Sequence, residues 1–230
     1  DYVLSGSWSK KAISEASMLT QVQTIASSED KKFTYAPNVD LWNISSDASY
    51  VHYCPNETIQ GVAIHNAPVV NAPLIADMSS VILSEPIDVS KFSLIYAGAQ
   101  KNLGPAGLAL VIVREDLLGH ALKETPSLLD YSVYAGSHSL ANTNNTFAIY
   151  MMGLVLEWVK QQGGVATLEA QNETKAKLLY DVIDASEFYL GVADPAHRSI
   201  MNVTFNLAKP ELLDAFVEQA LDAGLYALKG

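Results

Sequence analysis

The segment FSLIYAGAQKN, residues 92–102, contains a strand-like run, a small-residue exit and a lysine in direct succession. Its first part, Phe92–Tyr96, is apolar and rich in strand formers. Lys101 comes next, followed by the turn-rich LGPAG (residues 103–107) and a second strand-like run over residues 108–113. This order predicts a lysine at a strand exit, where small side chains leave room for a flat ligand near the backbone. Taken alone, the pattern also fits a surface lysine in a loop between two strands.

An acid ends an earlier apolar run in the same way. Leu74–Ala76 is apolar and leads directly into Asp77. An acid and a lysine at the exits of two strands suit pyridoxal phosphate (PLP), because the lysine can form a Schiff base and the acid can pair with the protonated pyridine nitrogen. Acid–lysine pairs at this spacing also occur by chance, so the two residues need the support of a wider match.

Four strings supply that match in order along the chain: YCPNETI (53–59), ADMSS (76–80), PIDVSK (86–91) and AGAQKNLGPAG (97–107). They resemble the phosphoserine aminotransferase family, which belongs to the class V branch of fold-type-I PLP enzymes. The resemblance implies an α/β fold. Residues 1–164 would form the PLP-binding large domain, with a mixed, mostly parallel sheet flanked by helices. Residues 165–230 would form a connecting helix and part of a smaller α+β C-terminal domain.

The resemblance also implies a role for each residue that would contact the ring of the cofactor. Lys101 would hold PLP and carry protons as the catalytic residue, and Asp77 would keep the pyridine nitrogen protonated. Trp8 would cover the ring face, and Thr58 would bond the ring hydroxyl oxygen. Without the resemblance, Trp8 reads as a packing aromatic and Thr58 as a helix N-terminal residue. His52, within a strand-like run, is more typical of a core histidine than of a catalyst.

Other residues are implied to surround the cofactor phosphate. Ser79 and Gln100 are candidates from the same chain, whereas Asn142-Thr143 would reach the cofactor of the partner subunit in a homodimer. The family has two prolines after this last pair, where the present sequence has Asn144-Asn145. Losing two prolines predicts a less stiff loop.

The remaining chain gives a coarse outline of the secondary structure. The Ser5-Gly6-Ser7 turn precedes a helical pattern, with Ser7 or Ser9 as N-cap, and a strand, turn and helix start together favour anion binding. Apolar spacing predicts a helix over residues 147–161, ended by Gly163-Gly164. Its core-facing stripe would comprise Phe147, Tyr150, Met151, Leu154, Val155 and Trp158. Further expected elements are a loop over 137–146, helices over 115–122, 165–185 and 211–223, and a strand over 199–207.

Bulk composition restricts the class of protein. The chain has 230 residues, a formal net charge of −11 and 49% hydrophobic residues. This composition is globular, and the acidic balance argues against a nucleic-acid or anionic-membrane surface. Cys54 is the only cysteine, so no intrachain disulfide can form, and a reducing, cytoplasmic location is expected. No apolar run is long enough to span a membrane, and we expect neither a signal peptide nor a metal.

The activity implied by the resemblance is transfer of an amino group between L-glutamate and 3-phosphohydroxypyruvate, giving O-phospho-L-serine and 2-oxoglutarate in serine biosynthesis. Another class V aminotransferase is one alternative, and a non-catalytic, truncated homologue that acts as a structural partner is another. Against the family pattern the chain begins late and stops early. The substrate-binding arginines are therefore not expected in it, since Arg114 and Arg198 are its only arginines.

Overall fold

The computed structural model describes residues 1–228, which form two compact units. The first unit contains Asp1, Ile44–Pro55 and Ala67–Glu169, and the second contains Tyr2–Asn43, Asn56–Asn66 and Ala170–Gly230. The chain therefore passes between the units several times. The division into domains at residue 164 stays a prediction.

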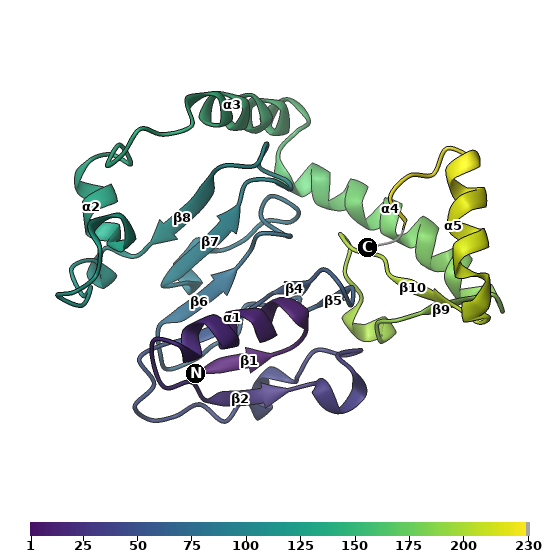
Figure 1. Ribbon diagram of the computed structural model, residues 1–230, viewed down its shortest axis with the longest axis horizontal. Coiled ribbons are helices and arrows are strands. Elements are labelled where there is room, and N and C mark those ends of the chain that lie inside the picture. The colour runs from purple at the N-terminus through teal and green to yellow at the C-terminus, as the bar shows by residue number, and fades with distance from the viewer. Residues whose placement is uncertain (229–230) are drawn as a thin grey trace. The chain divides into compact units, whose positions relative to one another are not determined.

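The first unit is built on four strands in the spatial order β3-β6-β7-β8. The last three of these strands are labelled in Figure 1. Their bounds are β3 Val51–Tyr53, β6 Leu74–Asp77, β7 Leu94–Gly98 and β8 Ala109–Val113. The β3–β6 and β6–β7 pairs are parallel, whereas β8 runs antiparallel to β7. The expected mixed, mostly parallel sheet is confirmed.

Parallel strands bring successive chain exits to one edge of the sheet. Leu74 and Ala76 of β6 are buried, as are Leu94, Ile95 and Ala97 of β7, so both strands are held by apolar packing. Asp77 is the last residue of β6 and pairs in register with Tyr96 of β7. The acid and the segment leading to the lysine therefore leave the sheet side by side.

The helices of the first unit follow the sheet. They are α2 (Tyr131–Gly136), α3 (Thr146–Gln161) and the start of α4 (Val165–Asp184), which continues into the second unit. The predicted loop over 137–146 and the two long helices are confirmed within a residue or two. The expected helix over 115–122 is wrong: only one 3-10 turn, Glu115–Leu117, forms there, and the segment reaches Gly119 in a left-handed conformation.

The apolar stripe of α3 departs from the prediction. Four of its six predicted residues, Phe147, Tyr150, Leu154 and Trp158, are 66%, 64%, 47% and 50% exposed, and the other two, Met151 and Val155, are partly buried. The stripe was expected to face a core, and in this chain it does not. Helical periodicity identifies which side chains share a face, but it does not tell whether that face is covered by the same chain.

The second unit combines several small layers. β1 (Tyr2–Leu4) pairs in parallel with β2 (Thr24–Ser27), and α1 (Ser7–Ser17) joins them. Two antiparallel pairs complete the strands: β4 (Asn56–Glu57) with β5 (Val62–Ala63), and β9 (Tyr189–Gly191) with β10 (Phe205–Leu207). The last helix is α5 (Leu213–Asp222). This unit therefore packs an N-terminal strand–helix segment, a hairpin and a C-terminal α+β layer.

The C-terminal layer contains a cluster of aromatic rings that meet mostly edge to face. Phe188, Tyr189, Phe205 and Phe216 lie with ring centroids 5.1–6.4 Å apart. The strand expected over 199–207 is shorter, because the hydroxyl oxygen of Ser199 accepts from the backbone N–H groups of Met201 and Asn202 at 3.0 Å. These bonds close a local turn that competes with a strand ladder.

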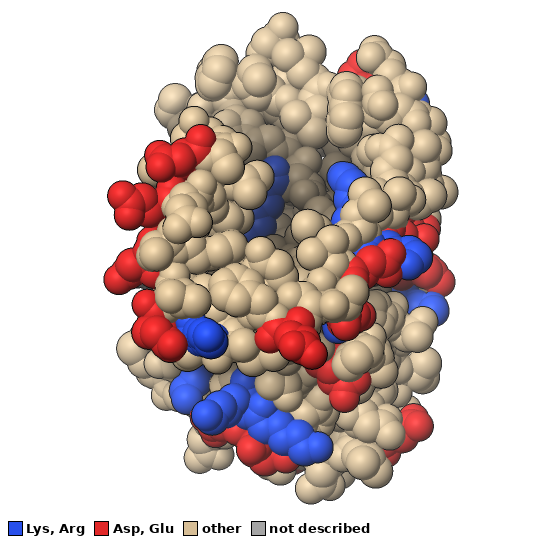
Figure 2. All heavy atoms as spheres, turned by 90° about the vertical axis from the view of Figure 1, so that its right-hand side faces the viewer, with Lys and Arg blue, Asp and Glu red and all other residues tan. Residues whose placement is uncertain are grey.

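Acidic residues outnumber basic ones over the whole chain, 25 to 14. On the face drawn in Figure 2, acidic side chains lie beside basic ones. None of the helices within residues 1–228 is both long and apolar enough to cross a bilayer.

Candidate cofactor site

Asp77 ends β6 with most of its hydrogen-bonding capacity unused. Its Oδ1 accepts from the backbone N–H of Ser79 at 3.0 Å, and no other hydrogen bond to this carboxylate is found among residues 1–228. An ionised carboxylate offers about four acceptor positions. Asp77 is partly buried, so an incoming N–H donor could reach it without competing with bulk water on every side.

Ser79 ties the exits of the two strands together. Besides donating its backbone N–H to Asp77, it accepts the N–H of Gly98 on its Oγ at 3.0 Å. A hydroxyl can donate one hydrogen bond while it accepts another. Ser79 therefore fixes β6 against β7 and retains a donor for an anionic group.

Lys101 lies in the turn that follows β7. The turn is closed by the backbone bonds Gly104 N to Ala99 O (2.8 Å) and Ala99 N to Leu108 O (3.0 Å). Gln100 folds back over Gly98, where an added Cβ would come within 2.5 Å of its Oε1. The missing side chain at Gly98 thus makes the close approach possible, and Lys101 and Gln100 both remain exposed.

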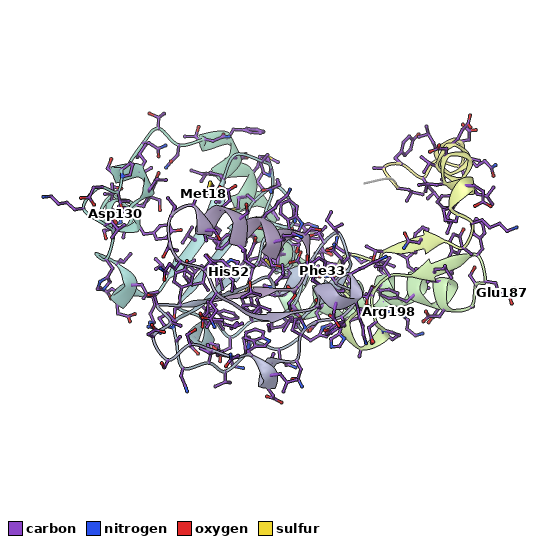
Figure 3. All side chains as sticks on the ribbon, turned by 60° about the horizontal axis from the view of Figure 1, so that its bottom comes forward. Met18, Phe33, His52, Asp130, Glu187 and Arg198 are labelled. Atoms are coloured by element: carbon purple, nitrogen blue, oxygen red, sulfur yellow. The ribbon has the colours of Figure 1, made fainter. Side chains whose placement is uncertain are left out.

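His52 belongs to the same face of the sheet as Asp77. It pairs in register with Ile75, two residues before the acid (Figure 3 labels His52). Its Nε2 lies 2.9 Å from the Tyr96 hydroxyl, and the two rings are stacked. Burial lowers the pKa of His52 to about 4, although the charge of Asp77 opposes the shift. The interpretation of His52 as a hydrogen-bonded core histidine is confirmed.

Trp8 and Thr58 belong to the second unit, whereas Asp77, Ser79, Gln100 and Lys101 belong to the first. Trp8 lies in the first turn of α1 and is 38% exposed, with the Lys11 ammonium 4.6 Å from its ring centroid. Thr58 begins the turn after β4 and is partly buried. Each of the two thus keeps some surface for a ligand within its own unit.

Sequence reasoning missed Glu57, which fills the corner expected to bind an anion. This side chain is fully buried, and it accepts the backbone N–H groups of Trp8 and Ser9 at 2.8 Å each. The N-cap is Gly6, so the expectation of Ser7 or Ser9 is wrong: Ser9 Oγ instead accepts the backbone N–H of Gly6 at 2.9 Å. The corner is anion-binding as predicted, but the anion is a side chain of the same chain. No local pattern around Glu57 announced a partner about 50 residues away.

Asn142 and Thr143 lie in the exposed loop between α2 and α3. The two asparagines that replace the family's prolines make bonds that proline could not: Asn144 Nδ2 donates to Ser139 O, and Asn145 Oδ1 accepts from Ala148 N at 3.1 Å as the N-cap of α3. The lower stiffness of this loop stays a prediction.

Neither arginine is available as a free cation. Arg198, labelled in Figure 3, makes a bidentate pair with Asp184, with N–O distances of 2.7 and 2.6 Å. Arg114 pairs with Asp116. A separate cavity of about 420 Å³ in the first unit is lined by apolar side chains such as Leu103, Ile112 and Met152, and none of the predicted site residues lines it.

The residues at the exits of β6 and β7 fit PLP. An amine suits its aldehyde, an open carboxylate suits its ring nitrogen, and a hydroxyl with a spare proton suits its phosphate.

Comparison with known proteins agrees with this chemistry. The family model for aminotransferase class-V matches residues 2–227. A phosphoserine aminotransferase of Nitrosomonas europaea is 54% identical over 239 residues, covering 100% of this chain and 65% of the relative. The structure of phosphoserine aminotransferase from Bacillus circulans subsp. alkalophilus matches with a TM-score of 0.97 at 44% identity, and covers 100% of this chain and 64% of that one. The PLP-bound enzyme from Trichomonas vaginalis matches with a TM-score of 0.94 at 38% identity, covering 100% and 67%. The chain thus spans about two thirds of the length of these relatives.

Proposed function

The chain belongs to the aminotransferase class-V family, and we propose that it transfers amino groups with PLP as cofactor. The observation that carries the proposal is the pairing of β6 with β7, which leaves the open carboxylate of Asp77 and the turn bearing Lys101 at neighbouring strand exits.

Each residue has a distinct task. PLP, when bound, supplies the electron sink for the bond broken at the substrate Cα. Lys101 would hold the cofactor and, as general base and then general acid, would remove and return the proton at that carbon. Asp77 holds the proton on the pyridine nitrogen, Trp8 fixes the ring plane, and Thr58 bonds the ring hydroxyl oxygen.

The cofactor phosphate is assigned to Ser79 and Gln100 of the same chain. Ser79 is supported by its fixed position, since its Oγ is already bound to the Gly98 N–H and its own proton remains to donate. Gln100 is supported by its exposed side chain beside Lys101.

We assign L-glutamate and 3-phosphohydroxypyruvate as substrates, with O-phospho-L-serine and 2-oxoglutarate as products, in serine biosynthesis in the cytoplasm. The support is the similarity to proteins named phosphoserine aminotransferase along the whole of this chain. Because Arg114 and Arg198 are each paired with an aspartate, we assign the substrate's anionic groups to neither.

The proposed assembly is a homodimer in which Asn142 and Thr143 reach the cofactor phosphate of the partner. The exposed apolar stripe of α3 supports this, because it begins four residues after Thr143 and a second copy would cover it. Mixing two inactive variants of the complete natural protein, Lys101→Ala and Asn142→Ala/Thr143→Ala, tests the sharing of sites. Activity should reappear at up to one competent site per hybrid dimer. Hybrids that are verified by mass spectrometry yet stay inactive would contradict it.

The activity itself is tested with the complete natural protein and Lys101→Ala as the control. We expect PLP to give the near-visible absorption of a lysine-bound cofactor, and glutamate to convert 3-phosphohydroxypyruvate faster than pyruvate, glyoxylate or oxaloacetate. Preference for one of the other keto acids would identify a different class V aminotransferase. Absence of cofactor absorption would favour the non-catalytic homologue.

A further inference from the structure

We propose that Glu57 is a positioning residue for the cofactor, which joins the two ligand contacts of the second unit, Trp8 and Thr58, into one rigid piece. The inference rests on the proposed function, because it concerns the roles assigned there to Trp8 and Thr58. It concerns a residue with no place in the chemistry itself.

The carboxylate of Glu57 accepts three hydrogen bonds from the segment that carries Trp8. Oε2 accepts the Trp8 N–H at 2.8 Å, and Oε1 accepts the Ser9 N–H at 2.8 Å and the Ser5 hydroxyl at 3.4 Å. The first two donors are first-turn amides of α1, which have no partner within the helix, and a negative charge is favoured at that helix end. The backbone position of Trp8 is therefore set directly by Glu57.

Thr58 is fixed by the same contact, because it follows Glu57 directly in the chain. The turn that it begins is bound to α1 a second time, where Gln60 Oε1 accepts the Ser7 N–H at 3.3 Å and Gln60 Nε2 donates to Ser7 Oγ at 2.9 Å. The hairpin therefore holds the first turn of α1 from both sides of Thr58. A shift of either ligand contact would carry the other with it.

Gly6 shows how closely the carboxylate is packed. A Cβ at this position would lie 2.5 Å from Cδ, 2.6 Å from Cγ and 2.7 Å from Oε2 of Glu57. The backbone of Gly6 is extended, with φ of 172°, so an alanine would fit its conformation but not the space. Gly6→Ala therefore displaces the carboxylate while leaving its charge in place.

A helix cap alone would also explain the bonds of Glu57. That role predicts lower stability of α1 with an unchanged site in the folded protein. The positioning role instead predicts that the cofactor's environment changes in molecules that are still folded. The visible circular dichroism of bound PLP separates the two, because it depends on the groups held against the ring.

The test compares Glu57→Gln and Gly6→Ala in the complete natural protein. The amide introduced by Glu57→Gln would turn a donor toward one of the backbone N–H groups in either orientation. We expect PLP to bind about tenfold more weakly to Glu57→Gln than to the wild type, the effect of losing one hydrogen bond to a charged group. Gly6→Ala should also bind PLP more weakly than the wild type. Both spectra should move toward that of Trp8→Phe. Glu29→Gln is the matched control, because Glu29 belongs to the same unit and its carboxylate makes one exposed pair, with Lys10, among residues 1–228.

The outcomes separate the two proposals. Weaker PLP binding and a changed spectrum in both variants, with Glu29→Gln unchanged, support the positioning role. Wild-type affinity and spectrum in the folded fraction of Glu57→Gln and Gly6→Ala would overturn it and leave Glu57 a helix cap. If Glu57→Gln fails to fold, Gly6→Ala decides by the same criteria. Wild-type protein that binds no PLP at Lys101 would overturn the proposed function instead.

Discussion

Asp77 and Glu57 are two acidic residues at chain turns, one in each unit, and their surroundings differ sharply. Glu57 is fully buried and receives two backbone N–H groups and a hydroxyl from its own chain. Asp77 is only partly buried, and Ser79 N–H is its one hydrogen-bond donor among residues 1–228. Both accept backbone amides, so the amide bond alone does not distinguish them.

The difference shows how to separate an internal anion from a ligand-binding one. A carboxylate whose acceptor positions are filled by the protein has completed its hydrogen bonding on folding, and further donors gain little from it. A partly buried carboxylate with vacant positions still gains from a charged donor, and its bond to that donor is strengthened by the lower local dielectric. By this criterion Asp77 is suited to bind a ligand, whereas Glu57 stabilises the folded chain.

The largest effect is expected at Lys101, the residue assigned to hold the cofactor that Asp77 would bind. Lys101→Ala should abolish covalent attachment of PLP, leaving weak binding through the phosphate, because no other amine is assigned to the aldehyde. Borohydride reduction followed by peptide mapping should place the pyridoxyl label on Lys101 in the wild type and nowhere in the variant. A label on another lysine of the wild type would remove the basis for reading Asp77 as open toward the cofactor.

Asp77→Asn should slow the amino-transfer half-reaction by roughly 10- to 150-fold, the range for losing about 1.5–3 kcal/mol from a charge-assisted hydrogen bond. An amide cannot hold the pyridinium proton by charge. Folding should change little, since only the bond to Ser79 depends on this carboxylate in the described chain. Single-turnover rates equal to wild type would show that another group serves the ring nitrogen.

Glu57→Ala should have the opposite balance, with its main effect on local stability. Two first-turn amides of α1 would lose their acceptor, which costs about 1–3 kcal/mol for a buried group. Hydrogen exchange at Trp8 and Ser9 should speed up accordingly, by roughly 5- to 150-fold. In Asp77→Ala the corresponding increase should be confined to Ser79. If the amides of α1 exchanged equally slowly with and without the Glu57 side chain, Glu57 would not stabilise the helix, and the two acids would not differ in this respect.

Local pattern predicted the first unit better than the second. The apolar runs before Asp77 and Lys101 determine β6 and β7, and parallel pairing then brings their exits together. Glycines at 163 and 164 and the apolar spacing before them located α3 and α4. These features depend on neighbouring residues, so the sequence alone was sufficient.

Contacts between segments that are distant in the sequence could not be predicted from local patterns. Glu57 meets α1 across 48 and 49 residues, and its role is visible only once both segments are folded. The same limit explains the apolar stripe of α3. Its spacing correctly predicted the helix, but the spacing could not show whether residues of this chain pack against the stripe. The residue assignments at the site came largely from resemblance, and their roles stay proposals until tested.

The smallest effect is expected at His52, beside the open acid. Burial lowers the pKa of this side chain to about 4, below the ordinary 6.5, while the charge of Asp77 pulls in the other direction. The ring is therefore neutral at neutral pH, and its Nε2 can share one proton with the Tyr96 hydroxyl. NMR signals of the His52 ring should stay constant between pH 8 and about 5.5.

The consequence for stability has a definite sign. An unfolded His52 takes up a proton below about pH 6.5, whereas the folded one does so only near pH 4, so the unfolded state binds more protons in that window. The contribution of His52 is fully present above pH 6.5 and is lost as the pH falls toward 4. His52→Gln, which can still bond Tyr96, should flatten the stability profile there, as measured by urea unfolding at about pH 7 and about pH 5. A His52 signal that titrates near the ordinary pKa of 6.5 would show that water reaches the ring. Water near Asp77 would then raise the local dielectric, and its hydrogen bond to a ligand would not be strengthened by burial.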